Sequence, residues 1–96
     1  DRKKHRIQAK VDTGAWKTSI DKELAERLGI LTQSNILWTK VYKSALGKEV
    51  RKVINLTFYL AGTRISTIAN VASRRSLRTP LIIGRKDLSG FLVKGS

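Results

Sequence analysis

The residues best able to do chemistry are Asp12, Thr13 and Gly14, which follow one another directly after an apolar stretch. A carboxylate can act as a general base or, once protonated, as a general acid. Gly14 would let the backbone turn sharply, and the Thr13 hydroxyl could bond neighbouring backbone and stiffen the loop. Hydrolysis of a peptide bond by carboxylates alone needs two of them that share one proton. One activates a water, and the other protonates the substrate carbonyl. The segment therefore predicts a rigidly held carboxylate that could form half of such a pair.

The second carboxylate has no obvious source within the same chain. Asp-Thr-Gly occurs once, and the other acidic residues lie in segments with different expected roles. Apart from Asp1 in the N-terminal charge cluster, they are Asp21, Glu23 and Glu26 in a helix, Glu49 in a hairpin and Asp87 in a late turn. A symmetric homodimer would supply the missing group, because an isologous interface places identical residues opposite each other. The residues alone leave open a simpler interpretation, in which Asp12 only caps a turn.

The segment that would carry Asp12 is a short strand. Apolar residues at every second position predict a half-buried strand over residues 6–11 that runs straight into Asp12. A helix should follow, with Thr18 or Ser19 as its N-terminal cap and Gly29 at its end. The apolar stripe of this helix would face the core and consists of Ile20, Leu24 and Leu28.

The remainder of the chain predicts a hairpin and further strands. The first arm of the hairpin would end near Lys43, its tip would be residues 44–47, and its second arm would run from Lys48 to residue 60. Additional strands are expected over residues 64–71, 81–83 and 91–93, with a basic loop over 73–79. Together these elements predict a single, mostly β domain over residues 1–96 with one short helix.

The composition narrows the possible classes of protein. Among the 96 residues, 20 Lys and Arg against 7 Asp and Glu give a formal net charge of +13, which attracts nucleic acid, acidic peptides or anionic lipid. Cysteine is absent, which excludes disulfides and thiol nucleophiles and fits a cytoplasmic protein. One His and no Cys argue against a zinc site, so we expect no metal and no cofactor. No apolar run could cross a bilayer, and no membrane association is expected.

Three features, in order, resemble the retropepsin family of aspartic proteases. The segment that resembles the active-site loop is Val11-Asp12-Thr13-Gly14-Ala15, followed by Thr18. The segment similar to the one that packs beneath that loop is Leu81-Ile82-Ile83-Gly84-Arg85, followed by Asp87 and Leu88. The 43–48 hairpin lies between them, where retropepsins carry the flap that closes over substrate. The resemblance implies a retropepsin-like closed β domain, active as a homodimeric endopeptidase through water held between two copies of Asp12.

The chain is also similar to a narrower, prokaryotic group labelled ATP-dependent zinc proteases, which is RimK-associated and RimB-like. The similarity lies in residues 9–15 with Thr18 and Ser19, in the 44–51 hairpin, and in residues 74–85. RimK ligates glutamate, so the resemblance implies an acidic, glutamate-rich peptide or protein substrate, which suits the positive net charge. The zinc and ATP of the label do not fit, because the chain has no His-Glu-x-x-His motif and no Gly-rich phosphate loop.

The expected substrate-binding residues lie in the loop, in the hairpin and in the late motif. They are Ala15, Trp16, Lys17, Lys43, Ser44, Ala45, Leu46, Gly47, Lys48, Arg51 and Arg85, with Arg74 and Arg75 as further basic candidates. Retroviral proteases carry an acidic residue, which pairs with the Arg of the late motif, where this chain has Trp16. Arg85 is therefore either neutralised by another acid such as Asp87 or available for a substrate carboxylate. The shared proton of the catalytic pair predicts highest activity at acidic to near-neutral pH.

Two other functions remain compatible with the sequence. One is a basic, small β nucleic-acid-binding module, with aromatic platforms among basic neighbours. Those platforms would be Trp38, Tyr42, Phe58 and Tyr59, although Phe58 falls in the apolar register of a strand. The other is a retropepsin-like dimerisation module without catalysis. Replacing Asp12 with Asn separates the protease from both alternatives, because only a protease would lose turnover while keeping its fold.

Overall fold

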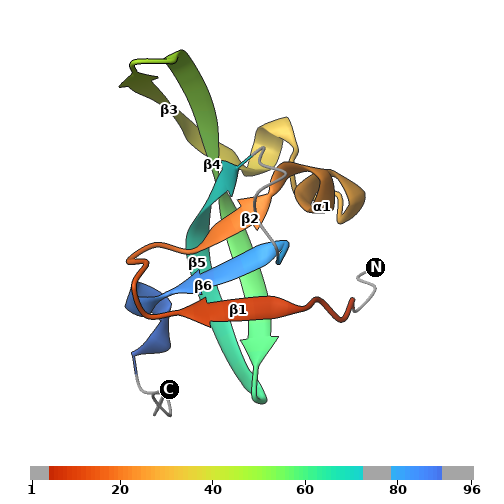
Figure 1. The fold of residues 1–96 in the computed structure, drawn as a ribbon. Coiled ribbons are helices and arrows are strands. Elements are labelled where there is room, and N and C mark those ends of the chain that lie inside the picture. Colours follow the sequence, from red (N-terminus) through yellow and green to blue (C-terminus); the bar gives the residue numbers. More distant parts are fainter. Residues whose placement is uncertain (1–4, 73–78, 90–96) are drawn as a thin grey trace.

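Most of the described chain is β-sheet. The computed structural model describes residues 5–72 and 79–89, apart from the side chains of Tyr42 and Ser44. Six strands form one sheet in the order β1-β6-β2-β5-β4-β3 (Figure 1). They are β1 (Ala9–Asp12), β2 (Ser19–Asp21), β3 (Ile36–Ser44), β4 (Gly47–Leu60), β5 (Thr63–Ala72) and β6 (Leu81–Gly84). One α-helix, α1 (Lys22–Arg27), and two short 3-10 helices, η1 (Gln33–Asn35) and η2 (Arg85–Leu88), complete the described elements and confirm a mostly β fold with one short helix.

β6 lies between β1 and β2, although it comes last of the six strands in sequence. β1 runs parallel to β6, with Asp12 opposite Gly84, whereas β2 runs antiparallel to β6, with Ser19 opposite Ile82. Since only residues 13–18 join β1 to β2, this loop has to cross the end of β6 (Figure 1). The topology therefore brings the Asp12 loop and the segment around Gly84 together.

The start of α1 differs from the prediction. Ile20 does not begin the helical stripe but belongs to β2, where pairing with both β5 and β6 leaves it 1% exposed. The cap of α1 is Asp21, whose Oδ2 accepts the backbone N–H of Leu24 at 3.3 Å, so neither Thr18 nor Ser19 caps the helix.

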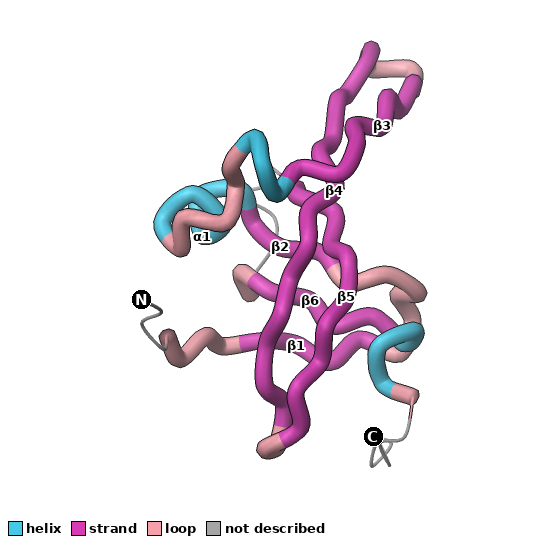
Figure 2. The backbone as a smooth tube through the Cα atoms, turned by 180° about the vertical axis from the view of Figure 1, so that it is seen from behind, coloured by secondary structure: helices cyan, strands magenta, loops and turns pink. Residues whose placement is uncertain are grey.

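The predicted hairpin forms from β3 and β4, and its tip extends away from the other strands (Figure 2). Ser44 pairs with Gly47, so Ala45 and Leu46 make the turn. Gly47 has φ +120, a backbone conformation that only glycine adopts readily. The Leu46 side chain is fully exposed. Below the tip, β4 continues into the body of the sheet, where it pairs with β5.

One hydrophobic core joins the sheet and α1. Its buried members are Ile20, Leu24, Ala25, Ile54, Leu56, Ala69, Val71, Leu81, Ile83 and Leu88. Phe58 and Leu60 are partly buried against this core, which confirms the inward register predicted for the second arm of the hairpin. β2 and β5 separate β6 from β4, so the sheet has to curve for Ile83 and Leu56 to share one core.

Several expectations differ from the structure or lie outside it. The first strand begins at Ala9 rather than at residue 6. Val11 is 38% exposed, because β1 lies at the edge of the sheet that the described strands form, next to β6. Most of the 73–79 loop and the whole 91–93 strand lie outside the described residues, so the prediction of one domain over 1–96 stays a prediction. Within residues 5–72 and 79–89, no helix has the length and apolar character needed to span a bilayer.

Candidate active site

Asp12 is held at the end of β1 by its own loop. The backbone N–H of Gly14 donates to Asp12 Oδ1 at 3.0 Å, and the N–H of Ala15 donates to the Asp12 carbonyl oxygen at 3.1 Å, which closes a tight turn. The Asp12 side chain is half-buried, while Thr13 and Gly14 are exposed. A carboxylate that is fixed by a backbone donor and still reaches solvent can bind a water or a substrate carbonyl.

The loop after Asp12 is seated on the start of η2 by backbone hydrogen bonds. The N–H of Arg85 donates to the Ala15 carbonyl at 2.7 Å, and the N–H of Lys86 donates to the Trp16 carbonyl at 3.0 Å. A Cβ atom added at Gly84 would lie 2.4 Å from the Lys17 carbonyl carbon and 2.6 Å from the Trp16 oxygen. Glycine is therefore required at position 84 by the close approach of the loop, and not by its backbone angles, since φ is −79 there.

A buried threonine ties the end of the loop to the same segment. Thr18 is 1% exposed, and its Oγ1 accepts the backbone N–H of Gly84 at 3.1 Å. The same hydroxyl donates its proton to Asp87 Oδ2. Because one hydroxyl serves both a donor and an acceptor, Thr18 fixes the loop relative to β6 and η2 together. This role was missed in the sequence, where Thr18 resembles a helix cap, because both of its partners lie more than 60 positions away.

Arg85 has an aromatic partner rather than an acidic one. Its guanidinium carbon lies 5.1 Å from the centroid of the Trp16 ring, within the range of a cation–π contact. Trp16 is 54% exposed and Arg85 is also exposed. The carboxylate of Asp87 is bonded to Thr18, so it is not the counterion of Arg85 that the sequence suggested.

The predicted basic residues of the hairpin lie on two different faces. Lys43 pairs directly with Lys48 across the hairpin, and both are exposed. Arg51 is three positions beyond Lys48 and therefore points to the opposite face of the ribbon. There its Nε lies 3.2 Å from Glu49 Oε2. One surface cannot present Arg51 together with the two lysines, whereas Lys43, Lys48, Ala45 and Leu46 are all exposed at or near the tip.

The other predicted site residues have simple placements. Ala15 is half-buried and Lys17 exposed, both in the Asp12 loop, and Gly47 is exposed at the hairpin tip. The side chain of Ser44 and the whole of Arg74 and Arg75 lie outside what the structure describes.

The remaining acidic residues of the described chain either make contacts elsewhere or lie exposed on α1. Asp21 caps α1, Asp87 binds Thr18 and Glu49 pairs with Arg51. Glu23 and Glu26 are exposed on α1. Among residues 5–72 and 79–89, no three His, Asp or Glu side chains gather closely enough to hold a metal ion. Asp12 therefore stands as a single carboxylate within one described chain.

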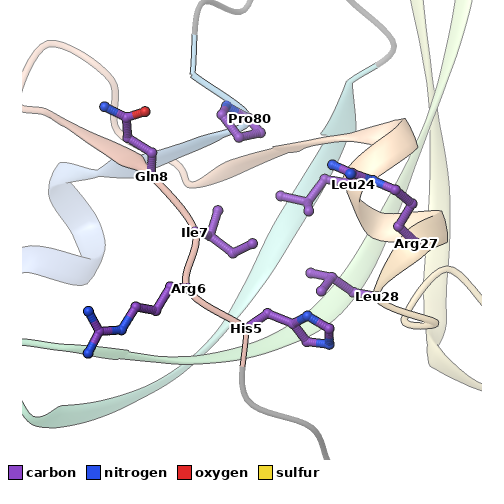
Figure 3. A pocket seen from close by; sticks show the side chains of 8 residues that line it. All are labelled: His5, Arg6, Ile7, Gln8, Leu24, Arg27, Leu28 and Pro80. Atoms are coloured by element: carbon purple, nitrogen blue, oxygen red, sulfur yellow. The ribbon is translucent and has the colours of Figure 1, made fainter.

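Two hollows on the described chain are not lined by Asp12. One, of about 460 Å³, lies between the N-terminal segment and α1 (Figure 3). It is lined by His5, Arg6, Ile7, Gln8, Leu24, Arg27, Leu28 and Pro80. The other, of about 510 Å³, lies beside β4, β5 and η2, where Lys86 and Asp87 line it.

Comparison with solved structures places the fold. The protease of Simian Foamy Virus (mac) matches over 94% of this chain and 88% of its own, with a TM-score of 0.69 and 18% identity. The foamy viral protease-reverse transcriptase matches with a TM-score of 0.65 and 16% identity over 94% of this chain, which corresponds to 11% of that longer one. The retroviral protease-like domain of Ddi1 from Leishmania major matches over 86% of this chain and 66% of its own, with a TM-score of 0.54 and 24% identity.

Comparisons of sequence give no match, either to a protein-family model or to a curated protein. No matching sequence therefore supports the predicted relationship to the RimK-associated group. The likeness of the backbone to the retroviral proteases and to the Ddi1 domain shows that this chain has a retropepsin-like fold.

Proposed function

We propose that this chain is an aspartic peptidase that is active as a homodimer, with Asp12 of each copy supplying one catalytic carboxylate. The observation that carries the proposal is the seating of Asp12, half-buried and held by the Gly14 N–H, on a loop fixed to Gly84 and η2. The fold shared with proteins named as retroviral proteases supports the same activity. The other described acids have separate positions, so a second copy is the natural source of the second carboxylate.

The proposed reaction is hydrolysis of a peptide bond by a carboxylate pair that shares one proton. The ionised Asp12 takes a proton from water while the water oxygen attacks the carbonyl carbon, and the protonated Asp12 gives its proton to the carbonyl oxygen. The resulting tetrahedral diol loses one hydroxyl proton to a carboxylate as its C–N bond breaks, and the other carboxyl protonates the leaving nitrogen. An acid and an amine are released, and the pair again holds one proton.

The proposed substrate is an acidic, glutamate-rich peptide or protein tail, as the resemblance to the RimK-associated group implies. The net charge of +13 supports an acidic substrate, and exposed Lys17, Lys43 and Lys48 lie in the loop and the hairpin. The β3–β4 hairpin would act as the flap, closing over the substrate and excluding water. A cytoplasmic location is part of this proposal and is supported by the lack of cysteine.

The first test is hydrolysis of an oligoglutamate-bearing peptide by wild type and by Asp12→Asn. General acid–base groups contribute about 10²–10⁴-fold each, so the variant should lose at least 10³-fold in kcat/KM while its urea unfolding stays unchanged. Asp21→Asn is the matched control, because it removes one carboxylate elsewhere and leaves a residue that caps a helix equally well. Equal activity of wild type and Asp12→Asn would end the proposal.

A mixing experiment tests whether the site is shared between two copies. If each dimer needs both carboxylates, a ninefold excess of Asp12→Asn chain should capture wild-type chains in inactive pairs and reduce their activity about tenfold. A site complete within one chain would be insensitive to the added variant. Activity of wild type alone should also rise faster than linearly with protein concentration below the dimer dissociation constant.

The rival function as a nucleic-acid-binding module predicts a different pattern. Trp38 and Tyr59 are exposed by 45% and 67%, as stacking platforms would have to be, whereas Phe58 is partly buried against the core. A module of this kind would bind any polyanion with steep salt dependence, and Asp12→Asn would not affect it. Binding without cleavage by either protein would favour this module or a non-catalytic dimerisation domain.

A further inference from the structure

The backbone of Arg85 is fixed to the catalytic loop itself. Its N–H donates to the Ala15 carbonyl at 2.7 Å, and the N–H of the next residue, Lys86, donates to the Trp16 carbonyl at 3.0 Å. Ala15 is only three positions after Asp12, and the Asp12 backbone pairs with Gly84, the residue before Arg85. The position of the Arg85 backbone relative to Asp12 is therefore set by short, direct connections rather than by a flexible surface loop.

The Arg85 side chain is held in place by Trp16. With the guanidinium carbon 5.1 Å from the ring centroid, the flat cation lies over the indole face. This contact places the cation over the ring without neutralising its charge, and a guanidinium carries five N–H donors. The contact with Trp16 already restricts the rotamers of Arg85. Binding a carboxylate would therefore cost less conformational entropy than binding by an unrestrained arginine.

The guanidinium has no carboxylate partner in the part of the chain that the structure describes. Asp87, two residues away, accepts the Thr18 hydroxyl instead, and Glu49 pairs with Arg51 on the hairpin. The neighbours of the stacked pair in sequence, Lys17 and Lys86, are also basic and exposed. An exposed arginine that is held by Trp16 and flanked in sequence by basic residues would bind an incoming anion, and its planar fork matches a carboxylate in a bidentate manner.

We infer that Arg85, positioned by its contact with Trp16, binds a carboxylate side chain of the substrate next to the catalytic loop and so determines a preference for glutamate over glutamine. The inference rests on the proposed peptidase function, and it assigns the acidic preference to one contact rather than to net charge alone. Arg85 is the specificity-determining residue in this arrangement, and Trp16 is a positioning residue.

The first experiment compares cleavage of an oligoglutamate peptide and its glutamine counterpart, at a salt concentration near 0.15 M that screens distant charges. The ratio of the two kcat/KM values in wild type should fall about 10- to 100-fold in Arg85→Gln, because a charge-assisted hydrogen-bonded pair is lost. Arg85→Lys keeps the charge without the fork and should give an intermediate ratio. Trp16→Leu should reduce the ratio although Arg85 is intact, which a purely electrostatic role of Arg85 does not predict.

Arg64→Gln is the matched control. It makes the same substitution with the same change of net charge at an exposed residue near the start of β5, opposite Tyr59. If net charge alone attracts the acidic peptide, Arg64→Gln and Arg85→Gln should lower the ratio equally. That result, or an unchanged ratio in Arg85→Gln, would overturn the inference.

A binding experiment separates this inference from the proposed catalysis. In Asp12→Asn with Trp38→Phe, Trp16 is the remaining tryptophan and reports on its own surroundings. Its fluorescence should change on titration with the oligoglutamate peptide at concentrations about 10- to 100-fold below those needed for the glutamine peptide, and Arg85→Gln should abolish that difference. A preference that depends on Arg85 supports the inference even if no cleavage occurs, whereas equal binding of both peptides contradicts it even if cleavage is real.

Discussion

Replacing Gly84 with Ala should destabilise the protein by pushing the catalytic loop off β6. The backbone angles at Gly84, φ −79 and ψ 162, suit alanine, so no strain arises from the conformation itself. The new methyl group would lie 2.4 Å from the Lys17 carbonyl carbon, against about 3.4 Å for an ordinary contact. The loop would have to retreat by about 1 Å, since the atoms that the methyl group meets belong to the backbone of Trp16 and Lys17 and cannot rotate away.

The expected magnitude follows from the hydrogen bonds that hold the loop. They join Arg85 to Ala15 at 2.7 Å, Lys86 to Trp16 at 3.0 Å and Gly84 to Thr18 at 3.1 Å. A retreat of about 1 Å takes all three beyond the distance at which a hydrogen bond is retained. Each contributes about 0.5–1.5 kcal/mol net, so the free energy of unfolding should fall by about 2–4 kcal/mol, a large part of the 5–15 kcal/mol typical of a domain.

The assay is urea unfolding followed by circular dichroism at several fixed protein concentrations, because the stability of a dimer depends on concentration. With an m-value of about 1–2 kcal/mol/M, the midpoint should move down by roughly 1–4 M. Gly14→Ala is the matched control in the same loop. Its added Cβ would meet Asp12 Oδ1 at 3.3 Å and nothing closer, so its change should stay within about 1 kcal/mol. If Gly84→Ala unfolds at the same midpoint as Gly14→Ala, the loop is not seated on β6 as described.

Two further substitutions test the contacts around the loop and the helix. Thr18→Val keeps the shape of a buried side chain but leaves the Gly84 N–H and the Asp87 carboxylate without their partner, and urea unfolding should show a loss of about 2–4 kcal/mol. Thr18→Ser keeps the hydroxyl and should lose only about 1 kcal/mol for its missing methyl group, so equal losses would contradict the hydrogen-bonding role. Asp21→Ala removes the cap of α1 and should lower thermal stability by about 1 kcal/mol, whereas Asp21→Asn should not, and a loss in both variants would point to charge rather than capping.

The elements predicted correctly are those whose signal is local. Alternation along β4 fixed which side chains face the core, because a strand exposes and buries residues with a period of two and needs no knowledge of its neighbours. The 64–71 and 81–83 strands were also found, within a residue of their observed bounds. The turn at the hairpin tip could be placed because Gly47 has a positive φ that few other residues adopt.

The elements missed are those that depend on distant partners. Residues 18–20 resemble a helix cap followed by an apolar position, and only pairing with β5 and β6 makes β2 a strand. Val11 follows an inward alternation but lies on a strand at the edge of the described sheet, which leaves it 38% exposed. The role of Thr18 likewise depends on Gly84 and Asp87, which lie more than 60 positions away in sequence. A local pattern cannot report contacts of this kind.

The site itself shows the same division between local and distant signals. The Asp12 turn follows from three consecutive residues, whereas the stacking of Arg85 on Trp16 joins positions that only the crossing of β6 by the loop brings together. That crossing also explains why the type of residue at position 16 matters for Arg85. An acid there could neutralise the arginine, whereas the indole contacts the guanidinium without neutralising its charge. If Arg85 binds a substrate carboxylate as proposed, the residue at position 16 decides whether its charge is already paired or available to substrate.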